Sequence, residues 1–279
     1  ATVAQAGREL APRTAGHLLC FLPGAPEIRR AGEELAGLTG RVVLPLHGSL
    51  SAEEQDLALA PSSQPKIILA TNLAETSLTV EGVTDVIDSG LQKVVRYDAE
   101  RGLDRLQTER ISQDSAEQRT GRAGRTGPGR ALRLWDPREK LAPHREPEIA
   151  RVDLAGPLLE VVAWGGDPRE FDWFEPPPRE AVGAALELLE RLGAVRDRRL
   201  TPEGEQMHRL SLHPRLSRVL LAAGGSFQAA AACAVLSERL PAWSFEGTST
   251  PSDVLSLVDR LDRLPRSIRQ AAEQIATQA

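Results

Sequence analysis

The chain has 279 residues, of which 41% are hydrophobic and 26% are charged, and its formal net charge is −5. This profile is typical of a globular protein with a sizeable core, and the length allows two domains. The negative charge excludes a uniformly basic nucleic-acid coat but leaves room for a local basic groove. No run approaches the ~18 apolar residues of a membrane span, and no signal-peptide pattern opens the chain, so we expect no membrane partner.

The two cysteines, Cys20 and Cys233, lie far apart inside apolar runs. Such cysteines are typical of core residues in a reducing compartment, so we expect no disulfide and a cytoplasmic location. None of the five histidines has metal-ligand spacing with a cysteine or another histidine, so no metal site is expected. The chain begins at Ala1 and its only methionine is Met207, which indicates an excised or renumbered piece of a longer protein.

The first half of the chain alternates strands and helices. Residues 1 to about 15 lack clear periodicity and are interpreted as a linker. Strands are expected over 17–24, 41–48, 66–71 and 83–90. Helices are expected to begin at Pro26 and at Ser51, the second with a capping-box pattern. This alternation is typical of a parallel, doubly wound sheet.

The segment 93–112 differs, because two β-rich stretches flank Asp98–Gly102 and predict a hairpin. A helix is then expected to begin at Asp114 or Ser115, to carry AEQRTGRAGR and to end at the turn 126–129. A last strand follows over 130–135, and three prolines indicate a domain boundary: Pro137, Pro143 and Pro147.

Beyond that boundary the pattern becomes helical. Helices are expected over 153–164, 179–192 and 253–264, the last interrupted at Pro265. Between the second and the third, a strand-turn-strand leads to Thr201 as a helix N-cap, and this arrangement resembles a winged-helix module. Glutamates occupy the polar side of the 179–192 helix, which favours a scaffold role over phosphate contact.

Gln118, Arg122 and Arg125 are the candidate catalytic residues. On a helix, spacings of four and three residues would place all three side chains on one face. Gly121 and Gly124 lie between them, and a glycine inside a helix costs about 0.5–1 kcal/mol, so a close approach of ligand or backbone is expected. Guanidinium groups bind phosphate and stabilise the charge that develops in phosphoryl transfer. For an isolated RxxR, a solvated basic helix face would be the better interpretation.

The segment QRTGRAGR (118–125) resembles motif VI of superfamily 2 helicases, and ATNLAETSLTVEGVTDVIDSG (70–90) resembles motif V of their DEAH-box branch. HLLCFLPGAPEI resembles the strand of motif IV, and PLHGSLSAEEQ resembles the segment after it. These motifs cover about residues 15–135 in the order of the family. The chain is thereby identified as a member of the DEAH-box helicases, most similar to the bacterial HrpB-type branch.

This resemblance implies an α/β fold: a RecA-like parallel sheet with a β-hairpin insertion, followed by a winged helix and an all-α segment. The implied domains are a second RecA-like helicase domain (1–148), a winged-helix domain (149–208) and a truncated helical-bundle segment (209–279).

The resemblance also implies a role for each motif residue. Arg122 and Arg125 would be arginine fingers, and Gln118 would contact the γ-phosphate or the lytic water. Three residues would lie near the phosphates and the ribose: Ser77, Thr79 and Glu81. The implied cofactor is ATP, or another NTP, with Mg²⁺. The metal would be held mainly by a first RecA-like domain, because the chain contains neither a GxxxxGKS/T phosphate loop nor an Asp-Glu-Ala-His run.

Four further residues would touch the nucleic-acid backbone: Thr71, Asn72, Gly48 and Ser49. Hydroxyls, amides and exposed backbone N–H groups at strand ends are common phosphate contacts and read no base sequence. Turn and cap chemistry is the alternative for Thr71, Asn72 and Ser77. The hairpin would separate strands or bridge domains, or would only extend the sheet.

The function indicated is the C-terminal motor half of an ATP-dependent helicase. We expect a monomer whose partners are single-stranded RNA or DNA and the first RecA-like domain of the same polypeptide. The chain alone is expected to lack ATPase activity. The alternative is a non-catalytic scaffold that binds nucleic acid or a protein partner. A winged-helix transcription factor fails to explain the first 135 residues.

Overall fold

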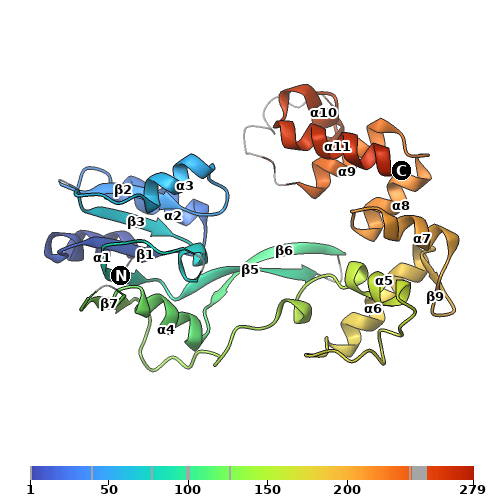
Figure 1. The fold of residues 1–279 in the computed structure, drawn as a ribbon. Helices are drawn as coiled ribbons and strands as arrows, with labels where there is room; N and C mark the ends of the chain where they lie inside the picture. The colour runs from blue at the N-terminus through green and yellow to red at the C-terminus, as the bar shows by residue number, and fades with distance from the viewer. Residues whose placement is uncertain are drawn as a thin grey trace. The chain divides into compact units, whose positions relative to one another are not determined.

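The computed structural model describes residues 2–38, 40–76, 78–98, 101–125, 127–238, 240 and 250–279. The chain divides into two compact units (Figure 1). Unit 1 comprises Ala1–Asp98 and Asp104–Pro147, and unit 2 comprises Ala99–Leu103 and Glu148–Ala279. Each unit has its own hydrophobic clusters and is described by itself below.

A five-stranded sheet forms the centre of unit 1. Its strands are β1 (His17–Phe21), β2 (Val42–Leu46), β3 (Lys66–Ala70), β4 (Val83–Asp88) and β7 (Arg130–Arg133). The order is β2-β3-β1-β4-β7, and every neighbouring pair is parallel. The parallel sheet predicted from the alternation of strands and helices is confirmed.

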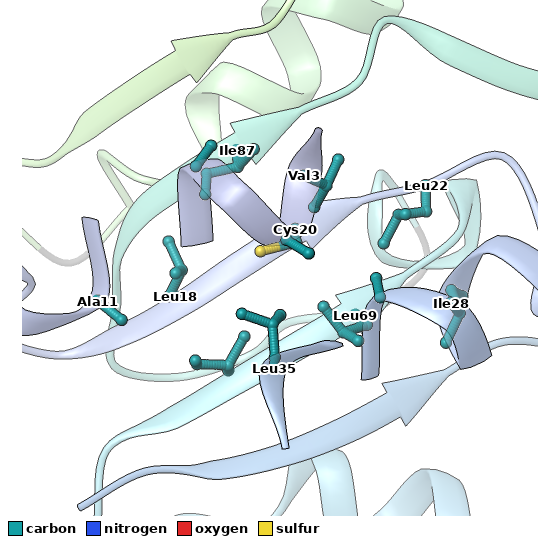
Figure 2. Close-up of a cluster of buried hydrophobic side chains, with 13 residues drawn as sticks. Val3, Ala11, Leu18, Cys20, Leu22, Ile28, Leu35, Leu69 and Ile87 are labelled. Carbon is teal, nitrogen blue, oxygen red and sulfur yellow. The ribbon is translucent and has the colours of Figure 1, made fainter. Parts of the chain in front are cut away.

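Both faces of this sheet are covered. The helices of unit 1 are α1 (Val3–Leu10), α2 (Ala25–Leu35), α3 (Ala52–Leu59) and α4 (Gln113–Gly121). Along β1, Leu18 and Cys20 join the cluster under α1 and α2 that Figure 2 shows, whereas Leu19 and Phe21 join the opposite cluster with Ala58 of α3. Alternate residues of a strand point to opposite faces, so these apolar strands are buried on both sides, as in doubly wound folds.

The first residues of the chain form a helix, so the linker predicted there is wrong. Val3–Leu10 forms a helix in which Val3 and Ala6 are buried in the core. Gly7 packs so closely that a Cβ built on it would lie 3.2 Å from Cδ2 of Leu35. The side chain of Thr2 caps the helix by accepting from the N–H of Gln5. The Thr-x-x-Gln start signal was therefore present in the sequence.

Helix α4 is shorter than expected. It begins after Ser112 rather than at Asp114 or Ser115, and it ends at Gly121, with Arg122 as its C-cap. Glycine is a poor helix former, so Gly121 and Gly124 mark the end of the helix instead of lying in its interior. Apart from the neighbouring residues and the helix's own backbone, no heavy atom of the described residues lies within 4 Å of a Cβ built on either glycine, so the expected close approach of another backbone is not observed there.

Two further strands, β5 (Leu91–Asp98) and β6 (Leu103–Arg110), form the expected hairpin as a separate two-stranded sheet. The connection between them is only four residues long, which requires an antiparallel pair. Arg96 on β5 forms an ion pair with Glu109 on β6.

Unit 2 is mostly helical. Its elements are α5 (Ala155–Ala163), α6 (Arg179–Arg191), β8 (Val195–Arg196), β9 (Arg199–Leu200), α7 (Pro202–Arg209), α8 (Pro214–Ala222), α9 (Phe227–Ser237), α10 (Asp253–Val258) and α11 (Arg266–Gln278). One cluster joins α5, α6, β8 and α7, and a second joins α8 to α11. Thr201 caps α7 as expected. Both cysteines are free and buried, and no helix in the described part of the chain is long and apolar enough to cross a membrane.

Candidate functional site

One open pocket in unit 1 brings together Gln118, Arg122 and Arg125. Its volume is about 320 Å³, and Glu75, Thr76 and Gly121 complete its lining. Gln118 comes from the last turn of α4, whereas the two arginines come from the turn that follows it. The three side chains therefore line one pocket from a helix end and the turn after it, and not from one helical face as predicted.

Each of the two arginines is tied to the segment between β3 and β4. The guanidinium of Arg122 donates through Nη1 to the carbonyl of Leu78 at 2.8 Å and through Nη2 to the carbonyl of Glu75. Nη1 of Arg125 donates to Oγ1 of Thr79 at 2.7 Å. Burial lowers the pKa of Arg122, and the charge of Arg125 lowers it further. Guanidinium groups nevertheless remain protonated in proteins, so both side chains offer positive charge to an anion.

The three residues expected around the nucleotide differ in their relation to the pocket. Ser77 lies outside the described residues. Thr79 contacts Arg125 directly. Glu81 is exposed, lies two residues before β4, and does not line the pocket.

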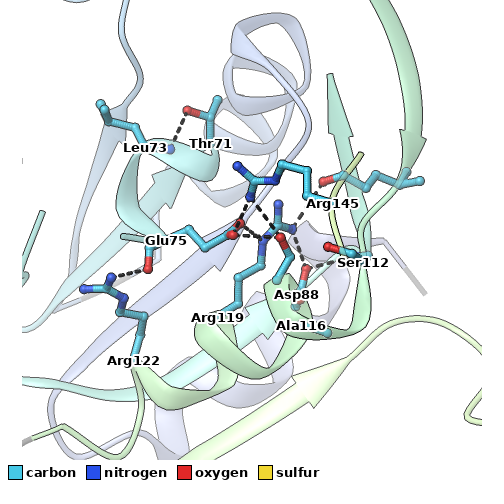
Figure 3. A network of polar contacts seen from close by, with 12 residues as sticks. Thr71, Leu73, Glu75, Asp88, Ser112, Ala116, Arg119, Arg122 and Arg145 are labelled. Atoms are coloured by element: carbon cyan, nitrogen blue, oxygen red, sulfur yellow. Dashed lines mark hydrogen bonds and ion pairs between the residues drawn. The ribbon is translucent and has the colours of Figure 1, made fainter. Parts of the chain in front are cut away.

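Beside the pocket lies a buried ionic network that the sequence did not reveal (Figure 3). The side chain of Arg119 is 0% exposed, with Nε 3.0 Å from Oε2 of Glu75 and Nη1 2.8 Å from Oδ1 of Asp88. Its guanidinium carbon also lies 4.9 Å from the centre of the Phe21 ring, a cation–π geometry. Arg119 therefore lies on the side of α4 that faces the sheet, and its buried positive charge is compensated by two carboxylates from distant segments of the chain.

Glu75 is the centre of this network. Its Oε1 accepts from Oγ of Ser115 at 2.7 Å and from Nη2 of Arg145 at 2.6 Å. At the other carboxylate, burial raises the pKa of Asp88, while the charge of Arg119 opposes that rise. One atom of each partner, Oδ2 of Asp88 and Nη2 of Arg119, is buried without a hydrogen bond in the described part of the chain.

The residues expected to touch nucleic acid gather at one edge of the sheet. Gly48 and Ser49 follow β2, and Thr71 and Asn72 follow β3, its parallel neighbour. The N–H of Thr71 donates to the carbonyl of Leu46, which joins the two strand ends. Gly48, Ser49 and Asn72 are exposed. The Thr71 hydroxyl accepts from the N–H of Leu73 at 3.4 Å, so the cap chemistry considered for this residue is present.

The site offers cations for phosphate but no carboxylate cluster for a metal. Within the described ranges, no group of three or more His, Cys, Asp or Glu side chains could hold a metal ion. The carboxylate that lines the pocket, that of Glu75, is already paired with Arg119 and Arg145.

The chain resembles known helicases in sequence and in fold. Residues 6–127 match the family described as the helicase conserved C-terminal domain. The chain is 44% identical over 240 residues to the ATP-dependent RNA helicase HrpB of Escherichia coli (strain K12), covering 84% of this chain and 30% of that protein. It is 42% identical over 224 residues to the probable ATP-dependent RNA helicase DHR2 of Saccharomyces cerevisiae, covering 75% of this chain and 30% of that protein.

Two crystal structures of Escherichia coli HrpB, one described as a DExH-box NTPase and one as a DEAH/RHA helicase, match the structure. Their TM-scores are 0.85 and 0.89 at 38% sequence identity, and the matches cover 99% of this chain and 34% and 35% of the HrpB chains. The chain therefore spans about a third of the length of these relatives. From its motifs, its parallel sheet and these similarities, we conclude that residues 6–127 are a helicase conserved C-terminal domain of the kind found in DEAH/RHA helicases.

Proposed function

We propose that this chain is the C-terminal motor half of an ATP-dependent DEAH-type helicase, in which Arg122 and Arg125 act as arginine fingers. The observation that carries the proposal is the convergence of both arginines and Gln118 on one open pocket. HrpB is described as an ATP-dependent RNA helicase and DHR2 as a probable one, which supports ATP as the nucleotide and RNA as the nucleic acid.

Within the pocket, each residue has a role that suits its chemistry. The two guanidinium groups stabilise negative charge on the phosphoryl group during transfer, and Gln118 orients the attacking water. Thr79 holds Arg125, and the carbonyls of Glu75 and Leu78 hold Arg122, so both arginines are oriented before the nucleotide arrives. Hydrolysis of ATP, bound with Mg²⁺, supplies the free energy for movement. The first RecA-like domain of the same polypeptide supplies the phosphate loop and the metal ligands.

The second group of residues contacts the strand on which the motor moves. Gly48, Ser49, Thr71 and Asn72 bind sugar and phosphate at the sheet edge, without reading bases. The β5–β6 hairpin separates the strands ahead of them. Opening and closing of the two RecA-like domains then moves single-stranded RNA along this edge.

The test is the RNA-stimulated ATPase activity of the protein that carries this chain together with the proposed first domain. Arg122→Ala and Arg125→Ala are each expected to lower kcat by about 10³–10⁵-fold, the range for an arginine finger. Arg138→Ala is the matched control, because this side chain is 89% exposed and, among the described residues, its guanidinium pairs with Asp136 alone. Wild-type kcat in Arg122→Ala would refute the finger assignment. RNA binding without any ATPase activity in the wild type would favour the scaffold function instead.

The isolated 279-residue chain holds half of the proposed nucleotide site and is expected to show no ATPase activity. A coupled ATPase assay on the purified chain, with and without RNA, measures this directly. Robust turnover that Arg122→Ala abolishes would show that the chain alone forms a complete site.

A further inference from the structure

The small β8–β9 hairpin of unit 2 carries an uncompensated pair of positive charges. Arg196 and Arg199 lie directly opposite each other in the antiparallel register, and both are exposed. Like charges that face each other across two strands destabilise the pair. Neither side chain forms an ion pair or a side-chain hydrogen bond within the described part of the chain.

The turn of the same hairpin has a second unfavourable feature. Asp197 has φ 49° and Arg198 has φ 64°, so two consecutive non-glycine residues occupy the left-handed region. Asn-Gly or Gly-Gly would form this turn with less strain. Arg198 is anchored by Asp167, with Nη1 3.0 Å from Oδ2. Three arginines and one aspartate leave residues 195–200 with a net charge of +2.

The hairpin is also held firmly at its base. Val195 is buried, and the hydroxyl of Thr201 donates to the carbonyl of Gly193 while accepting from the N–H of Gly204. Helix α7 lies so close that a Cβ on Gly204 would meet the carbonyl oxygen of Ala194 at 1.9 Å. Arg196 and Arg199 therefore lie on a hairpin whose base is fixed by packing and hydrogen bonds.

We propose that Arg196 and Arg199 bind phosphates of single-stranded nucleic acid, which makes the β8–β9 hairpin a second contact outside unit 1. The inference rests on the proposed function in one respect, since the ligand is the strand on which the helicase acts. Guanidinium groups suit phosphate geometry, and a phosphate placed between two arginines removes the repulsion that the free hairpin carries. Strained and mutually repelling residues are expected where binding compensates them.

The experiment measures binding of the 279-residue chain to a short fluorescein-labelled oligouridylate by fluorescence anisotropy at several salt concentrations. The variant is Arg196→Gln/Arg199→Gln. The matched control is Arg191→Gln/Arg269→Gln, which removes two exposed arginines that pair with Glu187 and Glu273 on their own helices. Both variants change the net charge by the same amount.

Loss of two phosphate contacts is expected to reduce the slope of log affinity against log salt by about 1.4, since each contact on a single strand contributes about 0.7. Between about 50 and about 200 mM salt, the advantage of the wild type over the variant then shrinks about sevenfold. The control is expected to keep the wild-type slope. The hairpin variant is also expected to melt no lower than the wild type, because the repulsion is removed.

An unchanged slope in the hairpin variant, or an equal change in the control, would overturn the proposal. A clear drop in melting temperature would overturn it as well, because the arginines would then serve the fold. Asn72→Ala is measured in parallel and separates the two ideas. If Asn72→Ala weakens binding and the hairpin variant does not, the sheet-edge contact of the proposed function is supported and the hairpin contact is refuted.

Discussion

The side chain of Glu75 is 1% exposed and accepts hydrogen bonds from Ser115, Arg119 and Arg145. The backbone of the same residue accepts from Arg122 and donates to the carbonyl of Asn72. One residue thus joins the proposed arginine finger to the segment proposed to bind nucleic acid. Its side-chain contacts fix the backbone that holds Arg122, because a buried carboxylate with three partners has little freedom to move.

Replacement of this carboxylate tests how much of unit 1 depends on it. Glu75→Ala leaves Arg119 buried with only Asp88 as a counterion, and removal of one member of a buried ion pair destabilises by about 3–5 kcal/mol. Urea unfolding followed by circular dichroism measures the change. Glu81→Ala removes an exposed carboxylate from the same segment and is expected to stay within about 0.5 kcal/mol of the wild type. A loss below about 1 kcal/mol in Glu75→Ala would show that Asp88 alone compensates Arg119.

At this scale the sequence predicted the residues that line the pocket better than the buried ones. Gln118, Arg122 and Arg125 were expected on one side, and they do line one pocket. The inward direction of Arg119 was missed, because arginine on a helix normally indicates a solvated face. Its burial depends on two carboxylates 44 and 31 residues away, and spacing along α4 carries no information about such contacts.

Secondary-structure elements were predicted best where local signals and burial agree. The strand expected over 66–71 is observed as Lys66–Ala70, and the capping box expected at Ser51 is present. Helix α1 was missed because its buried face consists of Val3 and three alanine or glycine residues. Small residues give a weak hydrophobic pattern, although they allow the close helix packing seen at Gly7. The end of α4 differs from the prediction because Gly121 and Gly124 act as ordinary helix terminators.

Two helical glycines in unit 2 provide a matched test of packing. A Cβ on Gly204 would lie 1.9 Å from the carbonyl oxygen of Ala194, whereas a Cβ on Gly183 would meet no atom of the described residues within 4 Å other than its chain neighbours and its own helix backbone. Gly204→Ala must shift α7 away from the hairpin, and such overpacking costs about 1–3 kcal/mol. Gly183→Ala is expected to stabilise by about 0.5–1 kcal/mol through helix propensity. Thermal melts of both variants measure the difference, and equal shifts would mean that α7 moves freely.

Among the described residues, the hydrophobic clusters of unit 1 are separate from those of unit 2. The clusters of unit 1 draw on the sheet and on α1 to α4, whereas those of unit 2 draw on α5 to α11 and β8. A unit with its own core can unfold as its own cooperative transition. The change from alternating strands and helices to helices alone predicted this change of architecture, because each pattern buries its apolar residues in a different way.

Differential scanning calorimetry of the 279-residue chain is therefore expected to show two unfolding transitions. Glu75→Ala is expected to lower only the transition of unit 1, because all of its lost contacts lie there. Gly204→Ala is expected to lower only the transition of unit 2, where both Gly204 and Ala194 lie. A single transition that both variants shift equally would mean that the units unfold together. In that case the free energy of unfolding would belong to the whole chain, and losses at Glu75 would be felt at the β8–β9 hairpin.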